Sequence, residues 1–271
     1  MTASPRYQAI LFDLFDTLVR FDRERLPLLQ IGGRTVRSTV GHVHEVLRGW
    51  APQVTVEALH AGMGESWREA ERLRAIDHRE VGAFERFTYL FRCLSLDPEA
   101  CPVGLLAEMI ETHRRELAKA AEFPPHHRPL LEELRSRYRL AVVSNFDYTP
   151  TALSILREAG VAELFETIVV SDAVGWRKPA PRIFHETLDR MRLDPREALF
   201  VGDRADIDVA GAHRVGMEAA WLNPAGEPLP PGITSPAYEL RDLADLRAIL
   251  AGTANAPTHR MARAMHLNGE R

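Results

Sequence analysis

The sequence is poor in cysteine and aromatic residues and carries no excess of positive charge. Its 271 residues include only two cysteines, Cys93 and Cys101; aromatic residues make up 7% and the formal net charge is −4. Two cysteines are too few for a disulfide framework or a cysteine-rich zinc site. Both lie in apolar, helix-like surroundings, so we expect small buried side chains. The lack of a basic excess argues against a nucleic-acid-binding protein.

Long hydrophobic runs are also missing. No segment reaches the ~18 consecutive apolar residues typical of a membrane span, and no basic amphipathic run suggests a membrane surface. The apolar run near the N-terminus is short and is interrupted by Asp13, unlike a signal peptide. We therefore expect a cytoplasmic protein, a monomer or homodimer. Its composition, 45% apolar and 27% charged, is ordinary for a globular chain.

Strand and helix patterns alternate in the C-terminal half of the chain. After Pro124 and Pro125, short β-rich runs are separated by amphipathic helical segments as far as about residue 252. The expected strands are residues 140–143, 167–170, 198–201 and 218–222. Residues 9–12 form one more short apolar run, typical of a buried parallel strand. This alternation predicts an α/β fold with a doubly wound, largely parallel sheet that includes the first run.

A different pattern separates the first strand from the others. Residues 20–122 show helical periodicity without evident strand alternation, and we interpret them as an all-helical insertion after strand one. The predicted domains are therefore a core of residues 1–19 and 123–252, an inserted domain of residues 20–122, and a polar C-terminal tail of residues 253–271.

Polar residues follow the predicted strands at the points where the strands end. In a parallel sheet the carboxyl ends lie at one edge, so these side chains can converge. Three carboxylates near a hydroxyl and a lysine would form an oxygen-ligand site for Mg²⁺ beside an anion site. The alternative is that Asp13 only caps the following turn. The residues at the strand ends are Asp13, Ser144, Asn145, Ser171, Asp172 and Asp203; Lys178 follows in the segment after the strand at 167–170, and Asp208 closes the turn that begins at Asp203.

Four segments, taken in order, resemble the motifs of the haloacid dehalogenase-like hydrolases. They are DLFDT at 13–17, VVSN at 142–145, GWRKP at 175–179 and VGDRADIDVAGA at 201–212. The resemblance extends from residue 7 to about residue 223. It implies a Rossmann-like core, with the insertion as a helical cap of the first type.

The resemblance also implies roles for single residues. Asp13 would be the nucleophile that attacks phosphorus and forms an aspartyl-phosphate, and Lys178 would be the lysine that neutralises charge beside it. The implied substrate-binding residues are Thr17, Ser144 and Asn145. The implied Mg²⁺ ligands are Asp13, the backbone carbonyl of Phe15, Asp203 and Asp208. The implied substrate is a small phosphorylated metabolite.

The first motif departs from the family's phosphatase pattern, Asp-x-Asp-Gly-Thr. Phe15 stands where that pattern has its general acid/base, and Asp16 stands at the glycine position. The dehalogenase branch of the family has an aromatic residue there, but it lacks the acidic pair that Asp203 and Asp208 would provide. We expect a slow Mg²⁺-dependent phosphatase. The alternatives are a 2-haloacid dehalogenase-type hydrolase and a non-catalytic protein that binds a phosphorylated ligand or a partner.

Four further residues have two interpretations each. Arg34 and Arg37 begin the insertion and would either meet a substrate anion or form a solvated helix start. Asp172 and Asp206 would either support the site or only cap helices.

Overall fold

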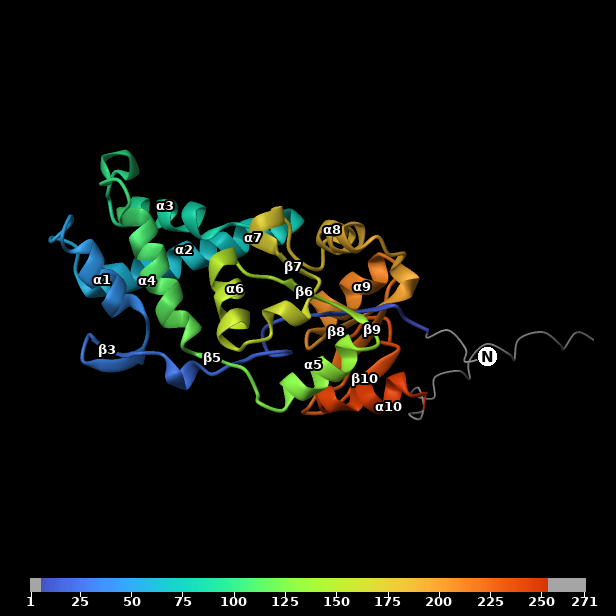
Figure 1. The fold of residues 1–271 in the computed structure, drawn as a ribbon. Helices are drawn as coiled ribbons and strands as arrows, with labels where there is room; N and C mark the ends of the chain where they lie inside the picture. The colour runs from blue at the N-terminus through green and yellow to red at the C-terminus, as the bar shows by residue number, and fades with distance from the viewer. Residues whose placement is uncertain (1–5, 253–271) are drawn as a thin grey trace, which may run out of the picture.

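A computed structural model describes residues 6–252 of the chain. The predicted tail at 253–271 lies outside the described residues. The molecule has two parts, with a layered α/β core at one end and the inserted segment at the other (Figure 1). None of the helices between residues 6 and 252 is long and apolar enough to cross a membrane.

The core contains one six-stranded sheet in the order β10-β9-β8-β1-β6-β7, with every pair of neighbours parallel. The predicted α/β fold class is confirmed. Strand β1 lies between β6 and β8, so the residue that follows it emerges near the middle of the sheet edge. The strands are β1 (Ala9–Phe12), β6 (Arg139–Ser144), β7 (Thr167–Val170), β8 (Ala198–Gly202), β9 (Glu218–Leu222) and β10 (Tyr238–Leu240).

Alternate residues of β1 face opposite sides of the sheet. Ile10 and Phe12 belong to the apolar cluster under helices α5, α6 and α10, whereas Ala9 and Leu11 belong to the cluster under α8 and α9. Because both faces are covered, the strand has no exposed side, as expected for a parallel sheet. The core helices are α5 (His127–Arg135), α6 (Thr149–Glu158), α7 (Ser171–Val174), α8 (Pro181–Met191), α9 (Ala210–Arg214) and α10 (Leu246–Leu250).

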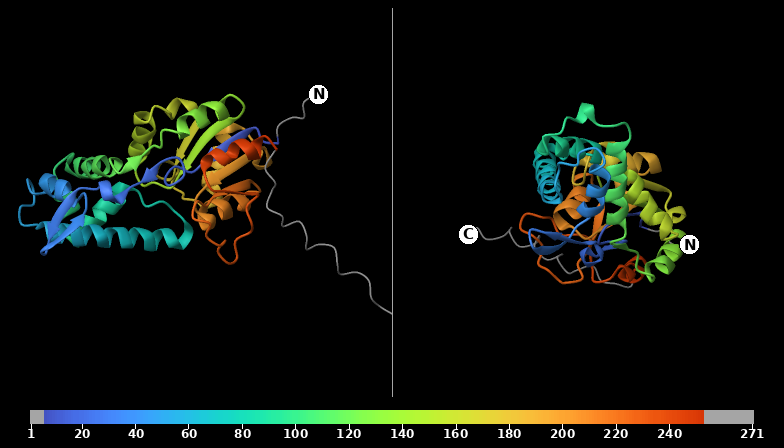
Figure 2. Two further views of the ribbon diagram at one scale, coloured as in Figure 1. Left: turned by 90° about the horizontal axis from the view of Figure 1, so that it is seen from below. Right: turned by 90° about the vertical axis from the view of Figure 1, so that its left-hand side faces the viewer.

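The inserted segment joins the core through a short antiparallel ribbon of β2 (Arg20–Phe21) and β5 (Ala121–Glu122). Its four helices pack around their own apolar cluster, and together they form a lobe distinct from the sheet (Figure 2). We call this lobe, residues 22–120, the cap. Its helices are α1 (Val40–Leu47), α2 (Val56–Asp77), α3 (Ala83–Cys93) and α4 (Leu105–Ala118).

The prediction that residues 20–122 are all-helical is wrong in two places, at the ribbon of β2 and β5 where the segment begins and ends, and at a hairpin within it. Strands β3 (Leu28–Ile31) and β4 (Arg34–Arg37) form an antiparallel hairpin before α1. The connecting residues Gly32 and Gly33 have φ of 54° and 76°, the left-handed values that a two-residue hairpin turn requires and that glycine adopts freely. Exposure alternates along β3, the period-two pattern of a strand.

The prediction of two buried cysteines is also wrong. Cys93 is exposed at the end of α3, and Cys101 is only partly buried in the loop before α4. Both lie at the periphery of the cap, outside the cluster that its helices share, although Cys101 packs against that cluster.

Candidate active site

Asp13 and Lys178 meet at the carboxyl edge of the sheet. Asp13 follows β1 directly, and its backbone N–H donates to the Val201 carbonyl at 2.9 Å. Lys178 Nζ donates to Asp13 Oδ1 at 2.5 Å and lies 2.8 Å from Asp208 Oδ1. All three side chains are buried. The structure therefore places a shielded ammonium group between two carboxylates.

The charge state of Lys178 follows from these contacts. Burial alone would lower its pKa, but the carboxylates of Asp13 and Asp208 outweigh burial and raise the pKa above its usual value. The ammonium group also lies 5.1 Å from the centre of the Phe200 ring, a favourable cation–π distance. Lys178 therefore carries a positive charge beside Asp13 at neutral pH.

Asp203 completes a cluster of three carboxylates. Oxygen atoms of Asp13, Asp203 and Asp208 lie within 4.8 Å of one another. Burial, together with the neighbouring carboxylates, raises the pKa of Asp203 to about 7. Burial and Asp208 raise the pKa of Asp13 to about 6, although Lys178 opposes the rise. A divalent cation would relieve this repulsion, and a set of carboxylate oxygens is a suitable donor set for Mg²⁺.

Local backbone geometry brings Asp208 into the cluster. Strand β8 ends at Gly202, and after two further residues the chain enters a π-helical turn, Ala205–Val209. The backbone N–H of Arg204 donates to Asp208 Oδ2 at 3.0 Å, which orients the carboxylate. A Cβ on Gly202 would lie 2.4 Å from that carboxylate. Glycine is therefore required for this close approach.

The two hydroxyl groups predicted to bind phosphate are buried and make no hydrogen bond within the described residues. Thr17 Oγ1 and Ser144 Oγ have no hydrogen-bond partner within residues 6–252. Ser144 ends β6, which pairs in register with β1, so it lies beside the loop that begins at Asp13. Unsatisfied buried hydroxyls are costly unless a ligand pairs with them. Both residues suit the predicted contact with phosphate oxygens.

The side chain of Asn145 is occupied by the backbone of Lys178. Its Nδ2 donates to the Lys178 carbonyl at 2.9 Å, and its Oδ1 accepts from the Lys178 N–H at 2.7 Å. This pair of hydrogen bonds holds the lysine at the sheet edge. Asn145, predicted to bind substrate, is placed where it positions Lys178.

Phe15 and Asp16 occupy the loop between the sheet and the cap. The Phe15 ring packs on Phe146, with ring centres 5.0 Å apart. Asp16 has φ of 60°, a value favoured by glycine. Its Oδ1 accepts from the Phe21 N–H at 3.1 Å. The Asp16 carboxylate thus stabilises the turn that leads into the cap.

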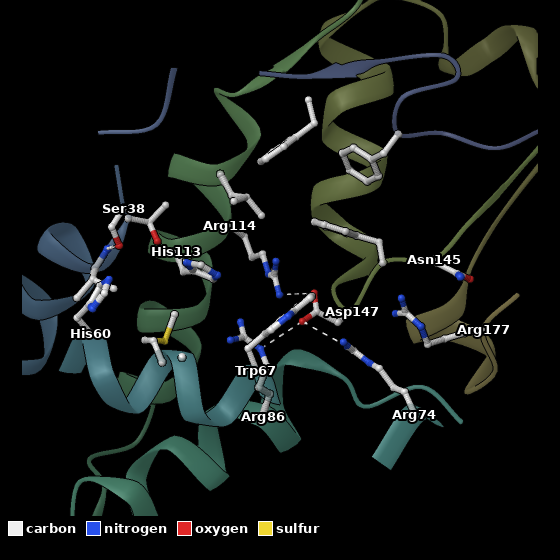
Figure 3. A pocket seen from close by; sticks show the side chains of 18 of the residues that line it. Ser38, His60, Trp67, Arg74, Arg86, His113, Arg114, Asn145, Asp147 and Arg177 are labelled. Atoms are coloured by element: carbon white, nitrogen blue, oxygen red, sulfur yellow. Dashed lines mark hydrogen bonds and ion pairs between the residues drawn. The ribbon is translucent and has the colours of Figure 1, made fainter. Parts of the chain in front are cut away.

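A cavity of about 500 Å³ lies between the core and the cap. Asp13 does not line it, but Phe15, Asp16 and Asn145 do, so it adjoins the carboxylate cluster. The basic part of its lining surrounds Asp147: the side chains of Arg74, Arg86 and Arg114 point toward this carboxylate (Figure 3). Apolar residues line much of the remainder, among them Phe21, Val40, Met63, Trp67, Leu117 and Phe146.

Sequence reasoning missed these arginines and Asp147. A signal was present: Arg86 and Arg114 lie four residues from the buried Leu90 and Ile110, on the apolar faces of α3 and α4. A charged residue on a buried helix face indicates a buried partner or ligand.

Three of the four residues with open interpretations pair with groups other than the three clustered carboxylates. Arg37 Nε lies 2.8 Å from Glu24 on the surface, and Arg34 is exposed on the hairpin. Asp172 accepts hydrogen bonds from the backbone and hydroxyl of Thr149, where α6 begins. The exposed side chain of Asp206 pairs with Arg204.

Relatives of known sequence support one family. Residues 7–216 match the family described as haloacid dehalogenase-like hydrolase. The chain is 34% identical over 136 residues to glyceraldehyde 3-phosphate phosphatase of Pyrococcus abyssi. That match covers 50% of this chain and 56% of the relative, so the chain spans about half the length of that relative. It is 25% identical over 246 residues to the HAD-hydrolase YfnB of Bacillus subtilis, covering 90% and 96% of the two chains.

Solved structures show the same fold over nearly the whole chain. A 2-haloacid dehalogenase from Pseudomonas syringae pv. Tomato DC3000 superposes with a TM-score of 0.65 at 25% identity, covering 92% of this chain and 100% of the other. The magnesium-bound structure of YfnB superposes with a TM-score of 0.55 at 23% identity, covering 90% and 99%. With its motifs at one sheet edge and most of its length matched, the chain belongs to the haloacid dehalogenase-like hydrolases.

Proposed function

We propose that this hydrolase is a Mg²⁺-dependent phosphatase that acts on a small phosphorylated metabolite, with Asp13 as the nucleophile. One observation carries the proposal: Asp13 is in contact with Lys178 and belongs to a cluster with Asp203 and Asp208. The phosphatase activity named for the Pyrococcus relative supports the same class of substrate.

The arrangement suits attack at phosphorus. One Asp13 oxygen forms a bond to the phosphorus atom while the bond to the leaving oxygen breaks, which gives an aspartyl-phosphate. Water then attacks phosphorus, releases inorganic phosphate and restores the carboxylate. Lys178 stabilises the negative charge of the transferring group, and Thr17 and Ser144 donate hydrogen bonds to its oxygens.

Mg²⁺ would be held by Asp13, the Phe15 carbonyl, Asp203 and Asp208. It would supply positive charge against the oxygens of the phosphoryl group. Burial and the neighbouring carboxylates raise the pKa values of both Asp13 and Asp203, and a bound cation would offset that cost, which supports the proposal.

Phe15 makes the proposed enzyme slow with ordinary substrates. A positioned acid/base contributes ~10²–10⁴-fold to a rate, and a phenyl ring can neither protonate a leaving oxygen nor activate water. The Asp16 carboxylate, which accepts from the Phe21 N–H, does not replace it in this conformation. Phosphates whose leaving groups need no proton, such as aryl phosphates, should react best.

A dehalogenase remains the second candidate because of two observations. An aromatic residue occupies position 15, and a 2-haloacid dehalogenase superposes over the chain. In that reaction Asp13 would attack carbon and expel a halide. The carboxylate cluster argues against it, since attack at carbon gives no use to Asp203 and Asp208 as metal ligands.

One panel separates the candidates. The protein is assayed with alkyl and aryl phosphates in Mg²⁺ or EDTA, and beside them with 2-haloacids for halide release. Phosphate release that depends on Mg²⁺ supports the proposal. Halide release that is indifferent to EDTA would replace it with the dehalogenase function, and inactivity with both classes would favour a non-catalytic binding protein.

A further inference from the structure

Three helices of the cap each direct one arginine at a single carboxylate of the core. Arg74 comes from α2, Arg86 from α3 and Arg114 from α4, and they surround Asp147 in the loop after β6 (Figure 3). Arg114 hydrogen-bonds to Asp147 Oδ1, Arg86 Nε lies 3.4 Å from Asp147 Oδ2 and Arg74 Nη2 lies 3.9 Å away. All four side chains are at least 96% buried.

The carboxylates around Asp147 carry less negative charge than the arginines around it carry positive charge. The other buried carboxylate, Glu80, accepts from Arg74 and from Arg177, which lies 2.7 Å away. Arg74 also pairs with the half-exposed Glu71. Asp147 is therefore the only carboxylate, among the described contacts, left for both Arg86 and Arg114.

Unsatisfied donors accompany this excess of charge. In the described part of the chain the buried Nε of Arg114 has no hydrogen-bond partner, and the buried Nε of Arg86 has only the 3.4 Å ion pair with Asp147 Oδ2, an oxygen that itself accepts no hydrogen bond. Burial and the neighbouring arginines lower the pKa of Arg86 to about 10, despite Asp147. Buried cations are expensive unless they are paired. The site is therefore suited to accept one more anion.

The cavity connects this basic cluster with the catalytic edge of the sheet. Arg86 and Arg114 line it on the cap side, and Phe15 and Asn145 line it on the core side. The lining is partly aromatic, and the Arg114 guanidinium lies 4.9 Å from the centre of the Phe146 ring. A molecule whose phosphate reaches Asp13 and whose other end enters this cavity would meet the arginines.

We propose that Arg86 and Arg114 form an anion subsite that binds a second negatively charged group, a carboxylate or a second phosphate, at the far end of the phosphorylated substrate. This assignment rests on the proposed phosphatase function. It deepens that function by giving the substrate class: small molecules with a phosphate at one end and another anion at the other.

A purely structural role for the cluster gives different expectations. If the arginines only fasten the cap to Asp147, substitutions should weaken the binding of charged and neutral ligands alike. If they form a subsite, Arg86→Gln should affect only ligands with a second anion. Asp147→Asn removes the competing carboxylate, so it should have the opposite effect and strengthen the binding of such ligands.

The test uses alkyl phosphonates of graded chain length, which are not hydrolysed, with a terminal carboxylate, a terminal phosphonate or a terminal carboxamide. Binding to the full-length protein is measured by calorimetry in Mg²⁺. We expect a charged terminus to bind about ten- to hundredfold more tightly than the amide at the best length, the range of a hydrogen bond between charged groups. The terminus that binds more tightly, carboxylate or phosphonate, identifies the second anionic group of the substrate.

Variants decide whether the arginines are responsible. Arg86→Gln should abolish the preference for a charged terminus, and Asp147→Asn should increase it. Arg92→Gln, an exposed arginine on the same helix, is the matched control and should leave the preference unchanged. Arg86→Gln and Asp147→Asn should change the preference for a charged terminus in opposite directions. If one of them does not fold, the other still tests the proposal.

The outcomes separate the subsite from the proposed function. Equal affinity for charged and neutral termini in the wild type would overturn the subsite, even if phosphate esters are hydrolysed. A charged preference that Arg86→Gln removes would support it, even if no phosphate ester is turned over. An equal loss of affinity for all termini in both variants would overturn it in favour of the structural role.

Discussion

Lys178 Nζ donates a 2.5 Å hydrogen bond to Asp13 Oδ1 although 165 residues separate the two in sequence. Asp13 is held because β1 lies in the middle of the sheet, and Lys178 is held because Asn145 hydrogen-bonds to its backbone on both sides. The proposed nucleophile and its counter-charge are therefore positioned at the ends of different strands of one sheet, without any bound substrate.

Gly202→Ala should disrupt the metal site without altering its ligands. The added Cβ would lie 2.4 Å from the Asp208 carboxylate, so that the π-helical turn has to shift. We expect a destabilisation of about 1–3 kcal/mol and a large loss of Mg²⁺ affinity. Denaturant unfolding and calorimetry measure the two effects.

Gly216→Ala is the control for the Gly202 variant. No heavy atom lies within 4 Å of its added Cβ, but Gly216 has a positive φ, so this variant introduces backbone strain without a steric conflict. Unchanged Mg²⁺ affinity in the Gly202 variant would contradict the assignment.

Asp203→Asn should stabilise the metal-free protein above neutral pH. In the folded state the pKa of Asp203 is raised to about 7, above its unfolded value of about 3.9. The contribution of the protonated Asp203 carboxyl group to the stability of the folded protein is therefore complete below pH ~4. It is lost as the pH rises through ~7, where the carboxyl group ionises in the folded protein too. Replacing the carboxylate should recover about 1–2 kcal/mol at pH ~8, measured by unfolding in EDTA.

With Mg²⁺ present, the wild type should be more stable than Asp203→Asn. The wild type should be stabilised by Mg²⁺ increasingly from pH ~6 to ~8, as Asp13 and Asp203 lose protons. Asp203→Asn should lose most of this response. A wild type whose unfolding is insensitive to both pH and Mg²⁺ would be incompatible with a carboxylate metal site.

Phe15→Asp should raise turnover of alkyl phosphates at least several-fold and change turnover of aryl phosphates little. It places a carboxyl group two residues after Asp13, the proposed nucleophile, from where a proton can be given to the leaving oxygen. The kcat ratio for the two substrate classes is the measurement.

Asp16→Gly is the companion variant. The backbone φ of 60° at Asp16 suits glycine, and the Asp16 carboxylate only accepts a backbone hydrogen bond. The variant should therefore retain activity. If Phe15→Asp is neutral and Asp16→Gly is inactive, Asp16 is the acid/base and the roles assigned to the loop are wrong.

Much of the core was predictable because its signals are local. The apolar runs before Asp13, Ser144 and Asp203 indicated buried parallel strands, and a parallel sheet has only one carboxyl edge. The convergence of Asp13, Asp203 and Asp208 followed from that topology. Their oxygens do lie within 4.8 Å of one another.

The cap was less predictable because its decisive contacts are between elements. The hairpin at 28–37 is mostly exposed, so it carries little hydrophobic alternation, and only the paired glycines signalled a turn. The meeting of Arg86 and Arg114 at Asp147 depends on how helices α3 and α4 dock on the loop after β6. No spacing in the sequence contains that information.

The central claim is that Asp13 accepts a phosphoryl group at phosphorus. The most direct test is to acid-quench the protein during turnover of an aryl phosphate with Mg²⁺ in ¹⁸O-labelled water, and to analyse the Asp13 peptide and the released phosphate by mass spectrometry. We predict a phosphorylated Asp13 peptide, absent in Asp13→Asn, with ¹⁸O in the phosphate and none in the Asp13 carboxylate. Incorporation of ¹⁸O into Asp13 itself, or an active Asp13→Asn variant, would contradict the account.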